Sequence, residues 1–278
     1  MINKMLFWNI RSVRSQRAFE RLMDLNRKHQ YSYIAILEPF QSPVELEIYR
    51  RRLGMANAKT NMYVKIWIFW SEDWEELESM DTIQQLTCQF CIRGTRETFK
   101  ITAVTIERLE LWEDLEYVAS TTTCPWMVGG DFNTILNDAE KLGGLPVTIT
   151  ETVDFAQCLG GVHLMNLGSS YNWWNGRIEG DIIFKRLDRV LGNNEFMNML
   201  PDTEVPHLIR QGSDHAPLHV ECNAENNHIA KPFKFMNFWT KHSEFHKRVE
   251  ESWQNECIGT PIKVLQTKLK RVKMALVE

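Results

Sequence analysis

The chain has 278 residues, of which 44% are hydrophobic and 24% are charged, a balance typical of a globular protein with one large domain and an appendage, or with two small domains. Its formal net charge of -4 excludes a protein that holds nucleic acid mainly through bulk positive charge, although it does not exclude a nuclease. The charge is unevenly placed, because residues 227–278 carry ten lysines and arginines against five acidic residues.

The first predicted elements form a strand, helix, strand unit. Residues 4–9 are a compact apolar run that stops at Asn9, and residues 33–37 are a second run that stops at Glu38. Between them, Ser15 is placed to cap a helix whose apolar residues recur at helical spacing. Each of the two predicted strands therefore ends in a side chain with a potential oxygen ligand.

The middle of the chain predicts a mixture of strands and helices. In chain order we predict a helix at residues 42–53, strands at residues 62–69, 84–92 and 98–104, a helix at residues 106–120 and a strand at residues 125–130. The last strand stops at Gly129 and Gly130 and is followed by Asp131 and Asn133. Glycines permit a turn where a side chain would clash, and ligands of layered α/β folds bind beyond the carboxyl ends of strands. The same residues also suit an ordinary turn.

The remainder of the chain predicts shorter strands and then helices. In chain order we predict a helix from Thr150 to residue 159, strands at residues 162–165, 171–174, 185–191 and 218–221, and helices at residues 239–253 and 261–276. Asp188 lies within one of these strands, and Asp214 and His215 lie in the turn that leads into the strand at residues 218–221.

The six cysteines are scattered and no signal-peptide pattern precedes them, so we expect a reducing intracellular compartment. Cys88 and Cys91 have the spacing of half a zinc site, but a strand would point their thiols to opposite faces, and we interpret them as structural. The longest apolar run, residues 63–70, contains Lys65 and is too short to span a bilayer, so we expect no membrane association.

Polar groups at five predicted strand ends or adjoining loops form a candidate site. They are Asn9, Glu38, Asp131 with Asn133, Asp188, and Asp214 with His215. A fold of two sheets can gather them at one rim, where carboxylates and an amide suit Mg²⁺ and a histidine suits a distant aspartate partner. Together these groups match phosphoester hydrolysis. Each also has an ordinary explanation: Glu38 can terminate a strand, Asp188 can form a surface ion pair, and His215 can pack under Pro217.

The order of five motifs resembles the endonuclease/exonuclease/phosphatase (DNase I-like) family. The motifs are Trp8-Asn9, Leu37-Glu38-Pro39, Gly130-Asp131-Phe132-Asn133, Arg186-Leu187-Asp188-Arg189-Val190-Leu191 and Ser213-Asp214-His215-Ala216-Pro217-Leu218. They define a domain at residues 1–222. The resemblance implies an α/β (α+β) fold, built as a four-layer α/β/β/α sandwich of two mixed sheets, with a helical extension at the carboxyl end.

The resemblance also implies which residues bind a metal ion and what the substrate is. Glu38 resembles the metal ligand, with Asn9 nearby and Asp214 close to the metal; the expected ion is Mg²⁺, with Mn²⁺ as an alternative, and the expected substrate is DNA. We expect no stable protein partner.

Four further residues resemble the family's catalytic groups. Asp131 resembles the group that activates water, Asn133 resembles a donor to phosphate, and His215 resembles the phosphate-contacting or base histidine, backed by Asp188. The residues leave open whether Asp131 or His215 accepts the proton.

Residues 223–278 resemble the linker and helical connector that leads to a reverse transcriptase in plant-type non-LTR (LINE-type) retroelement polyproteins. The chain ends before any polymerase signature, so we interpret it as a fragment or a domesticated remnant. Two alternatives remain for the basic tail, a solvated helical pair or a nucleic-acid contact. The resemblance implies a nuclear location, although no basic localisation cluster is present.

Two departures from the family bear on activity. After Val104 the helical pattern starts at once, which indicates that a tyrosine-containing loop of the family is deleted here. Asn172 also stands where the family often has threonine, although both can hydrogen-bond phosphate. Three interpretations therefore stay open: a Mg²⁺-dependent DNA endonuclease, an inactive or impaired retroelement remnant, and a small-molecule phosphatase of the same superfamily.

Overall fold

A computed structural model of the chain describes residues 4–105, 110–148, 152–168, 171–177, 181–223, 245–255, 257 and 259–277. The chain divides into two compact units, Met1–Glu225 and Asn226–Glu278. Within the described ranges, no helix is both long enough and apolar enough to cross a membrane.

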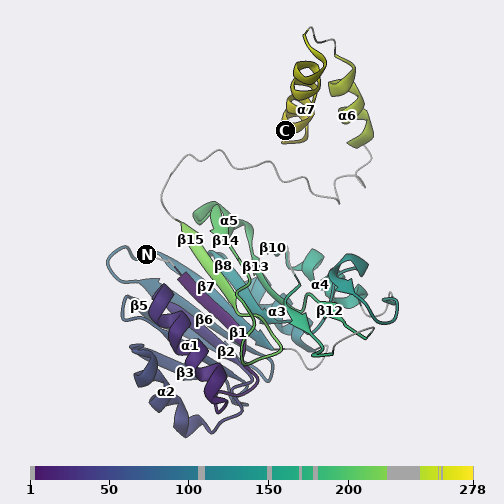
Figure 1. Ribbon diagram of the computed structural model, residues 1–278. Helices are drawn as coiled ribbons and strands as arrows, with labels where there is room; N and C mark the ends of the chain where they lie inside the picture. The colour runs from purple at the N-terminus through teal and green to yellow at the C-terminus, as the bar shows by residue number, and fades with distance from the viewer. Residues whose placement is uncertain are drawn as a thin grey trace. The chain divides into compact units, whose positions relative to one another are not determined.

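The first unit contains a mixed sheet of six strands in the order β14-β15-β1-β2-β4-β3 (Figure 1). Its strands are β1 (Lys4–Asn9), β2 (Tyr33–Leu37), β3 (Asn57–Thr60), β4 (Ile66–Trp70), β14 (Asp202–Glu204) and β15 (Leu218–Asn223). Strands β1 and β2 pair in parallel, whereas the other neighbours are antiparallel. The parallel pair places the carboxyl ends of β1 and β2 at one edge of the sheet.

A second mixed sheet has the strand order β10-β13-β8-β7-β6-β5. Its strands are β5 (Trp74–Asp81), β6 (Gln85–Ile92), β7 (Thr98–Thr105), β8 (Trp126–Asp131), β10 (Met165–Asn166) and β13 (Asp188–Gly192). Here β7 and β8 pair in parallel and the other pairs are antiparallel. A small third sheet consists of β9 (Lys141–Leu142), β11 (Trp173–Trp174) and β12 (Phe184–Lys185).

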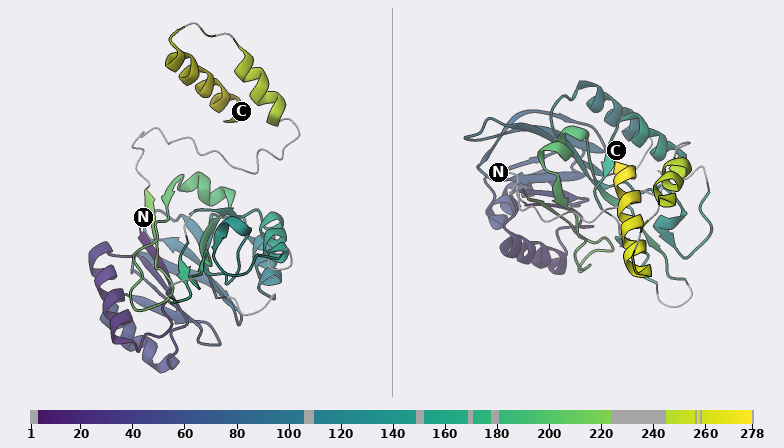
Figure 2. Two further views of the ribbon diagram at one scale, coloured as in Figure 1. Left: turned by 45° about the vertical axis from the view of Figure 1, so that its right-hand side comes forward. Right: turned by 90° about the horizontal axis from the view of Figure 1, so that it is seen from above.

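Helices cover the outer faces of the two large sheets. The helices of this unit are α1 (Gln16–His29), α2 (Leu46–Leu53), α3 (Glu110–Thr121), α4 (Val153–Gly161) and α5 (Asn194–Met199), with short 3-10 turns at Pro43–Glu45 and Asp138–Glu140. Seen from above in Figure 2, the purple helices and the teal helices lie on opposite sides of the sheets. Ser15 caps helix α1, and its Oγ accepts the Ala18 N–H, as the sequence predicts.

Alternate residues of each central strand enter different hydrophobic layers. In β1, Met5 and Phe7 point into the core between the two sheets, whereas Leu6 and Trp8 pack under α1 and α2. On the far side, Val104 and other residues of the second sheet pack under α3 and α4. Because both faces of the first sheet are buried, its central strands β2 and β4 are unbroken apolar runs. The predicted four-layer α/β/β/α sandwich is confirmed.

The two sheets approach closely at the end of β8. A Cβ atom added to Gly129 would lie 2.7 Å from the Phe7 ring of the opposite sheet, and one added to Gly130 would lie 2.1 Å from the Val104 carbonyl oxygen. Gly130 also has φ +145°, a conformation that side chains rarely adopt. The glycines therefore permit the contact between sheets as well as the turn that follows.

The second unit is a helical hairpin of α6 (Phe245–Gln254) and α7 (Pro261–Val277). An apolar seam between the helices includes Phe245 and Val249 of α6 and Leu269, Val272 and Leu276 of α7. The predicted helix start at Pro261 is confirmed, whereas residues 239–244 of the predicted helix before it lie outside the described residues.

Several element predictions are wrong in detail. The predicted strand at residues 62–69 begins only at Ile66, because Val64 adopts φ +57° in a turn. The predicted strand at residues 185–191 is split between β12 and β13, which belong to different sheets. Helix α3 begins at Glu110 in the described residues; residues 106–109, where its start was predicted, and Thr150, the predicted cap of α4, lie outside them. Strands β3, β5, β9 and β14 and helix α5 were not predicted.

Replacing Gly129 tests the close approach of the sheets. We expect Gly129→Ala to lower the free energy of unfolding by about 1–3 kcal/mol, because its methyl group overlaps the buried Phe7 ring. Urea unfolding of the two proteins measures the loss. Gly160→Ala is the matched control, since no atom lies within 4 Å of a Cβ at this helical position and alanine favours a helix. Equal stability of the two variants would contradict the close approach.

Candidate active site

The predicted site residues meet at one edge of the two large sheets. Asn9 ends β1 and pairs with Leu37, the residue before Glu38. Asp131 ends β8 and pairs directly with Asp188, the first residue of the antiparallel strand β13. The register of four strands therefore places these carboxylates and the amide together, although they come from distant parts of the sequence.

A hydrogen bond joins the two sheets at this edge. The Asn9 Nδ2 donates to Asp131 Oδ2 at 2.9 Å, and both residues are buried. The Asn133 backbone N–H donates to Asp131 Oδ1 at 2.8 Å, and Asn133 has φ +44° with an exposed side chain. Asp131 is thus fixed from both sides, and the Asn133 amide lies at the solvent edge of the site.

Asp188 and His215 form a buried pair beside Asp131. The His215 Nδ1–H donates to Asp188 Oδ2 at 2.9 Å, and the two residues are 1% and 2% exposed. The other ring nitrogen, Nε2, lies 3.8 Å from Asp131 Oδ2 and has no hydrogen-bond partner among the described residues. A buried donor without a partner has a high desolvation cost, which indicates a place for a ligand oxygen.

Charge and burial shift the acid–base properties of this cluster. Burial alone would lower the pKa of His215, but the facing carboxylates, first Asp188 and then Asp131, raise its pKa to about 9. Burial raises the pKa of Asp131, and the Asp188 charge raises it further. At neutral pH the histidine is therefore an imidazolium ion, and it faces a carboxylate that has an increased proton affinity.

Arg11 lies between the two carboxylates that the sequence predicts near a metal. Its Nε is 3.6 Å from Glu38 Oε2 and 3.4 Å from Asp214 Oδ1. The Arg11 backbone N–H also donates to Asn9 Oδ1 at 3.2 Å. All three predicted metal residues therefore contact Arg11, a partner that the sequence analysis did not identify.

The oxygen donors suit a hard divalent ion, and two different groups of residues are candidates to bind it. Glu38 and Asp214 are half-buried or partly exposed carboxylates that a divalent ion can bind if Arg11 moves away. Among the described residues, ligand atoms of Asp131, Asp188 and His215 also lie within 4.8 Å of one another. Because the pKa of His215 is raised to about 9, its Nε2 carries a proton at neutral pH, and the second group is better suited to proton transfer than to metal binding.

Asn172 positions the histidine pair, a role different from the predicted phosphate contact. Its side chain is buried, and its Oδ1 accepts the backbone N–H groups of Leu187 and Asp188 at 2.9 and 3.1 Å. Its backbone carbonyl accepts the Ala216 N–H at 2.8 Å, next to His215. One residue therefore holds the segments that carry both members of the pair. The position before two tryptophans gave no signal of this role.

Glu140 is a second residue that the sequence analysis missed. Arg186 and Arg189 flank Asp188 and are themselves buried, and both donate to Glu140, with Arg189 Nη1 2.8 Å from Glu140 Oε1. Burial alone would raise the pKa of Glu140, but the hydrogen bond and charge of Arg189 hold it below the usual value. The arginines therefore do not pair with Asp188, which is left to His215. Two arginines within the predicted apolar strand at residues 185–191 are a signal that such a partner exists.

The chain belongs to the Endonuclease/Exonuclease/phosphatase family, whose sequence profile matches residues 6–215. No curated protein sequence matches the chain.

Solved structures with the same fold include nucleases. The chain is similar to the endonuclease domain of TRAS1, a telomere-specific non-LTR retrotransposon, with 15% identity, a TM-score of 0.58, and coverage of 82% of this chain and 100% of that one. It is also similar to an AP endonuclease from Leishmania major (12% identity, TM-score 0.62, 79% and 87% coverage). An AP endonuclease from Archaeoglobus fulgidus has 14% identity, a TM-score of 0.59, and 80% and 99% coverage. At these identities the likeness concerns the fold.

Removing the Asp188 charge is expected to lower the pKa of His215 from about 9, because burial then acts against the weaker influence of Asp131 and Asp214 alone. Titration of the histidine ring by NMR in Asp188→Asn, with EDTA present, measures the shift. Since the pKa is raised in the folded protein, the pair stabilises the fold fully below about pH 6.5, and this contribution is lost as the pH rises through about 9. Asp214→Asn, which removes a more exposed carboxylate 4.0 Å away, should have a much smaller effect; an equal effect contradicts the pairing.

Replacing Arg11 tests whether it competes with a divalent ion. We expect Arg11→Ala to tighten Mn²⁺ binding roughly two- to fivefold, since a partly exposed ion pair contributes up to about 1 kcal/mol. Isothermal titration calorimetry measures the affinity. Arg14→Ala removes the same charge from an exposed residue nearby and is the matched control. Weaker Mn²⁺ binding in Arg11→Ala would show that Arg11 supports the site.

Proposed function

We propose that this chain is a Mg²⁺-dependent endonuclease that hydrolyses phosphodiester bonds of DNA. The observation that carries the proposal is the buried Asp188–His215 pair, whose Nε2 faces Asp131 without a hydrogen-bond partner in the described part of the chain. A charged imidazolium beside a fixed carboxylate suits a reaction in which a proton is transferred and negative charge is stabilised. Family membership supports hydrolytic chemistry, and nuclease structures share the fold.

The charge states favour Asp131 over His215 as the base. His215 has a pKa of about 9, so it already carries its proton at neutral pH and donates to a phosphate oxygen through Nε2. Asp131, whose pKa is raised by burial, accepts a proton from the attacking water. The water oxygen forms a bond to phosphorus, and the bond to one sugar oxygen breaks. Asn133, an exposed residue whose backbone N–H donates to Asp131, would donate its side-chain amide to the phosphate.

The metal site would draw on the first sheet and the loop before β15. Glu38, Asp214 and Asn9 supply the carboxylate and amide oxygens that Mg²⁺ prefers, and Mn²⁺ is an alternative. A bound ion would neutralise phosphate charge and the leaving oxygen. Arg11, released from the two carboxylates, would remain near enough to contact the substrate phosphate.

We further propose that the chain derives from a LINE-type retroelement and acts in the nucleus. Five motifs and the tail resemble such elements, and an endonuclease domain of a non-LTR retrotransposon shares the fold. Residues 1–222 would form the nuclease domain, and residues 223–278 would form the connector toward a reverse transcriptase.

Substitutions at the site test the proposed roles in nicking of supercoiled plasmid with Mg²⁺. We expect Asp131→Asn and His215→Ala each to reduce the nicking rate by about 100-fold or more, since each removes a proton-transfer or charge-stabilising group. His163→Asn replaces an exposed histidine outside the site with a residue that tolerates its φ of +53° and should nick at the unaltered rate.

Other outcomes would select the remaining alternatives. Nicking that persists in both site variants contradicts the proposed roles. Hydrolysis of a soluble phosphomonoester without DNA cleavage supports a phosphatase. Folded protein that performs neither reaction supports an inactive remnant, and a tyrosine-containing loop inserted after Val104 should then create activity.

A further inference from the structure

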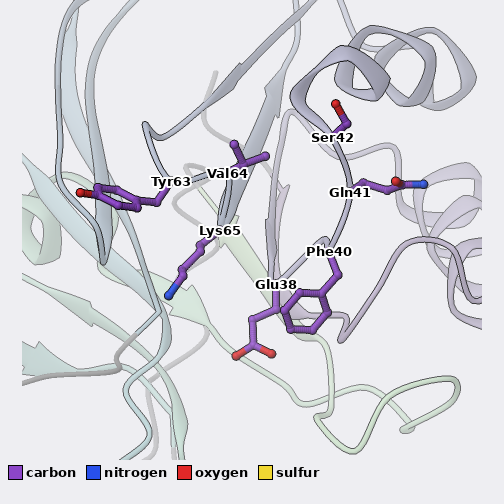
Figure 3. A pocket seen from close by; sticks show the side chains of 7 residues that line it. All are labelled: Glu38, Phe40, Gln41, Ser42, Tyr63, Val64 and Lys65. Carbon is purple, nitrogen blue, oxygen red and sulfur yellow. The ribbon is translucent and has the colours of Figure 1, made fainter.

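An apolar groove in the second unit has no role in the proposed chemistry. A hollow beside Glu38, lined also by Phe40 and Lys65 (Figure 3), adjoins the candidate metal site and belongs to the site already described. The groove lies instead between α6 and α7 of the helical hairpin (Figure 1) and has a volume of about 470 Å³. Its walls are formed by Phe245, Val249, Leu269, Lys270, Val272, Lys273 and Leu276.

The groove follows a regular apolar stripe along α7. The residues of the stripe recur at alternate intervals of three and four, and they are Ile262, Leu265, Leu269, Val272 and Leu276. This is the spacing of the a and d positions of a heptad, which form the face of a helix where another helix packs. Helix α6 leaves much of the stripe uncovered, because Ile262 is 71% exposed and Leu265 and Leu269 are 50% and 54% exposed. The stripe can therefore accept a further helix.

The hairpin buries too little apolar surface to be stable alone. Helix α6 has 10 residues and α7 has 17, and none of their described side chains is buried. Isolated helices of these lengths are marginal in water, and folding units below about 40 residues usually need a disulfide, a metal or association with another chain. A helix packed into the groove would supply the missing core.

The charge of the hairpin selects among the molecules that could fill the groove. Its described residues include seven lysines and arginines against two glutamates, and Lys270 and Lys273 line the groove itself. A second copy of the hairpin would bring the same excess of positive charge to these lysines, whereas a helix with acidic residues beside an apolar stripe would complement them. The phosphates of duplex DNA would pair with the lysines but would not fill an apolar groove.

We infer that the groove between α6 and α7 binds an amphipathic helix of a partner protein, in which acidic residues flank the apolar stripe. Leu269, Val272 and Leu276 pack against the apolar residues of the partner, and Lys270 and Lys273 pair with its carboxylates. The apolar contact supplies affinity, and the charges determine which helix is accepted. The inference does not depend on the proposed function, because the groove lies in a separate unit from the candidate active site.

Designed peptides test the inference with the full chain. Three fluorescein-labelled peptides of about three heptads are titrated with the chain, and fluorescence anisotropy measures binding. The first has leucine at the a and d positions and glutamate at the flanking positions. The second has lysine in place of each glutamate, and the third has serine in place of each leucine. We expect the first peptide to bind about tenfold more tightly, or better, than either of the others.

Charge reversal in the groove is expected to reverse the preference between peptides. In Lys270→Glu combined with Lys273→Glu, the acidic peptide should bind about tenfold more weakly and the lysine peptide more tightly, because both side chains line the groove. Both residues are exposed, so the helices are expected to form in this variant. The matched control combines Lys247→Glu with Lys263→Glu, two exposed residues outside the groove lining, and should retain the preference for the acidic peptide.

Hydrogen exchange measures whether the bound helix completes the core of the hairpin. The backbone amides of residues 245–254 and 261–277 should exchange rapidly in the free chain, because the described side chains of α6 and α7 are not buried. With the acidic peptide bound, we expect these amides to exchange about tenfold more slowly or less.

Other results would overturn the inference. No binding of any peptide, equal affinity for the acidic and lysine peptides, or a preference unchanged by charge reversal contradicts an acidic helix as the partner. Dimerisation of the chain in sedimentation experiments that is lost in Leu269→Ser identifies a second copy as the occupant. Duplex DNA that binds through Lys270 and Lys273, when no peptide binds, identifies nucleic acid instead.

Discussion

The hydrogen bond between Asn9 and Asp131 connects the two halves of the site. Asn9 ends a strand of the first sheet and Asp131 ends a strand of the second, and their side chains meet at 2.9 Å. The bond requires the sheets to approach more closely than large side chains allow, and Gly129 against Phe7 provides that approach. Gly129 permits the contact between the sheets, whereas Gly130 has a positive φ and lies against the Val104 carbonyl of the neighbouring strand β7. The Gly129-Gly130-Asp131 segment therefore permits the close packing and also supplies a carboxylate of the candidate site.

Two networks of charged residues flank this hydrogen bond, one buried and one partly exposed. On one side Arg186 and Arg189 both donate to Glu140, and Asp188 holds His215. On the other side Arg11 holds Glu38 and Asp214 in a half-exposed cluster that a divalent ion can reach. The buried network fixes Asp188 and His215, the pair for which we propose a role in charge stabilisation, whereas the exposed carboxylates can exchange Arg11 for a divalent cation.

Much of the fold could be predicted from the sequence, because strands buried on both faces are unbroken apolar runs, as at residues 4–9 and 33–37. The turn at Val64 could not, since a β-branched residue rarely adopts a positive φ and the turn is held by hydrogen bonds to the buried Asn61 side chain. The motifs identified the residues that gather at the edge. They could not reveal Arg11 or Glu140 as partners, because both residues lie outside the strands, where spacing along the chain does not fix the position of a side chain.

The central claim is that the edges of both sheets form one site for metal-dependent hydrolysis of DNA. Nicking of supercoiled plasmid by the unaltered chain, with Mg²⁺ and with Mg²⁺ plus excess EDTA, tests this claim most directly. The account predicts relaxed circles with Mg²⁺ and intact supercoils with EDTA. Folded chain that leaves the plasmid supercoiled in both conditions, or that nicks it equally in both, would contradict the account.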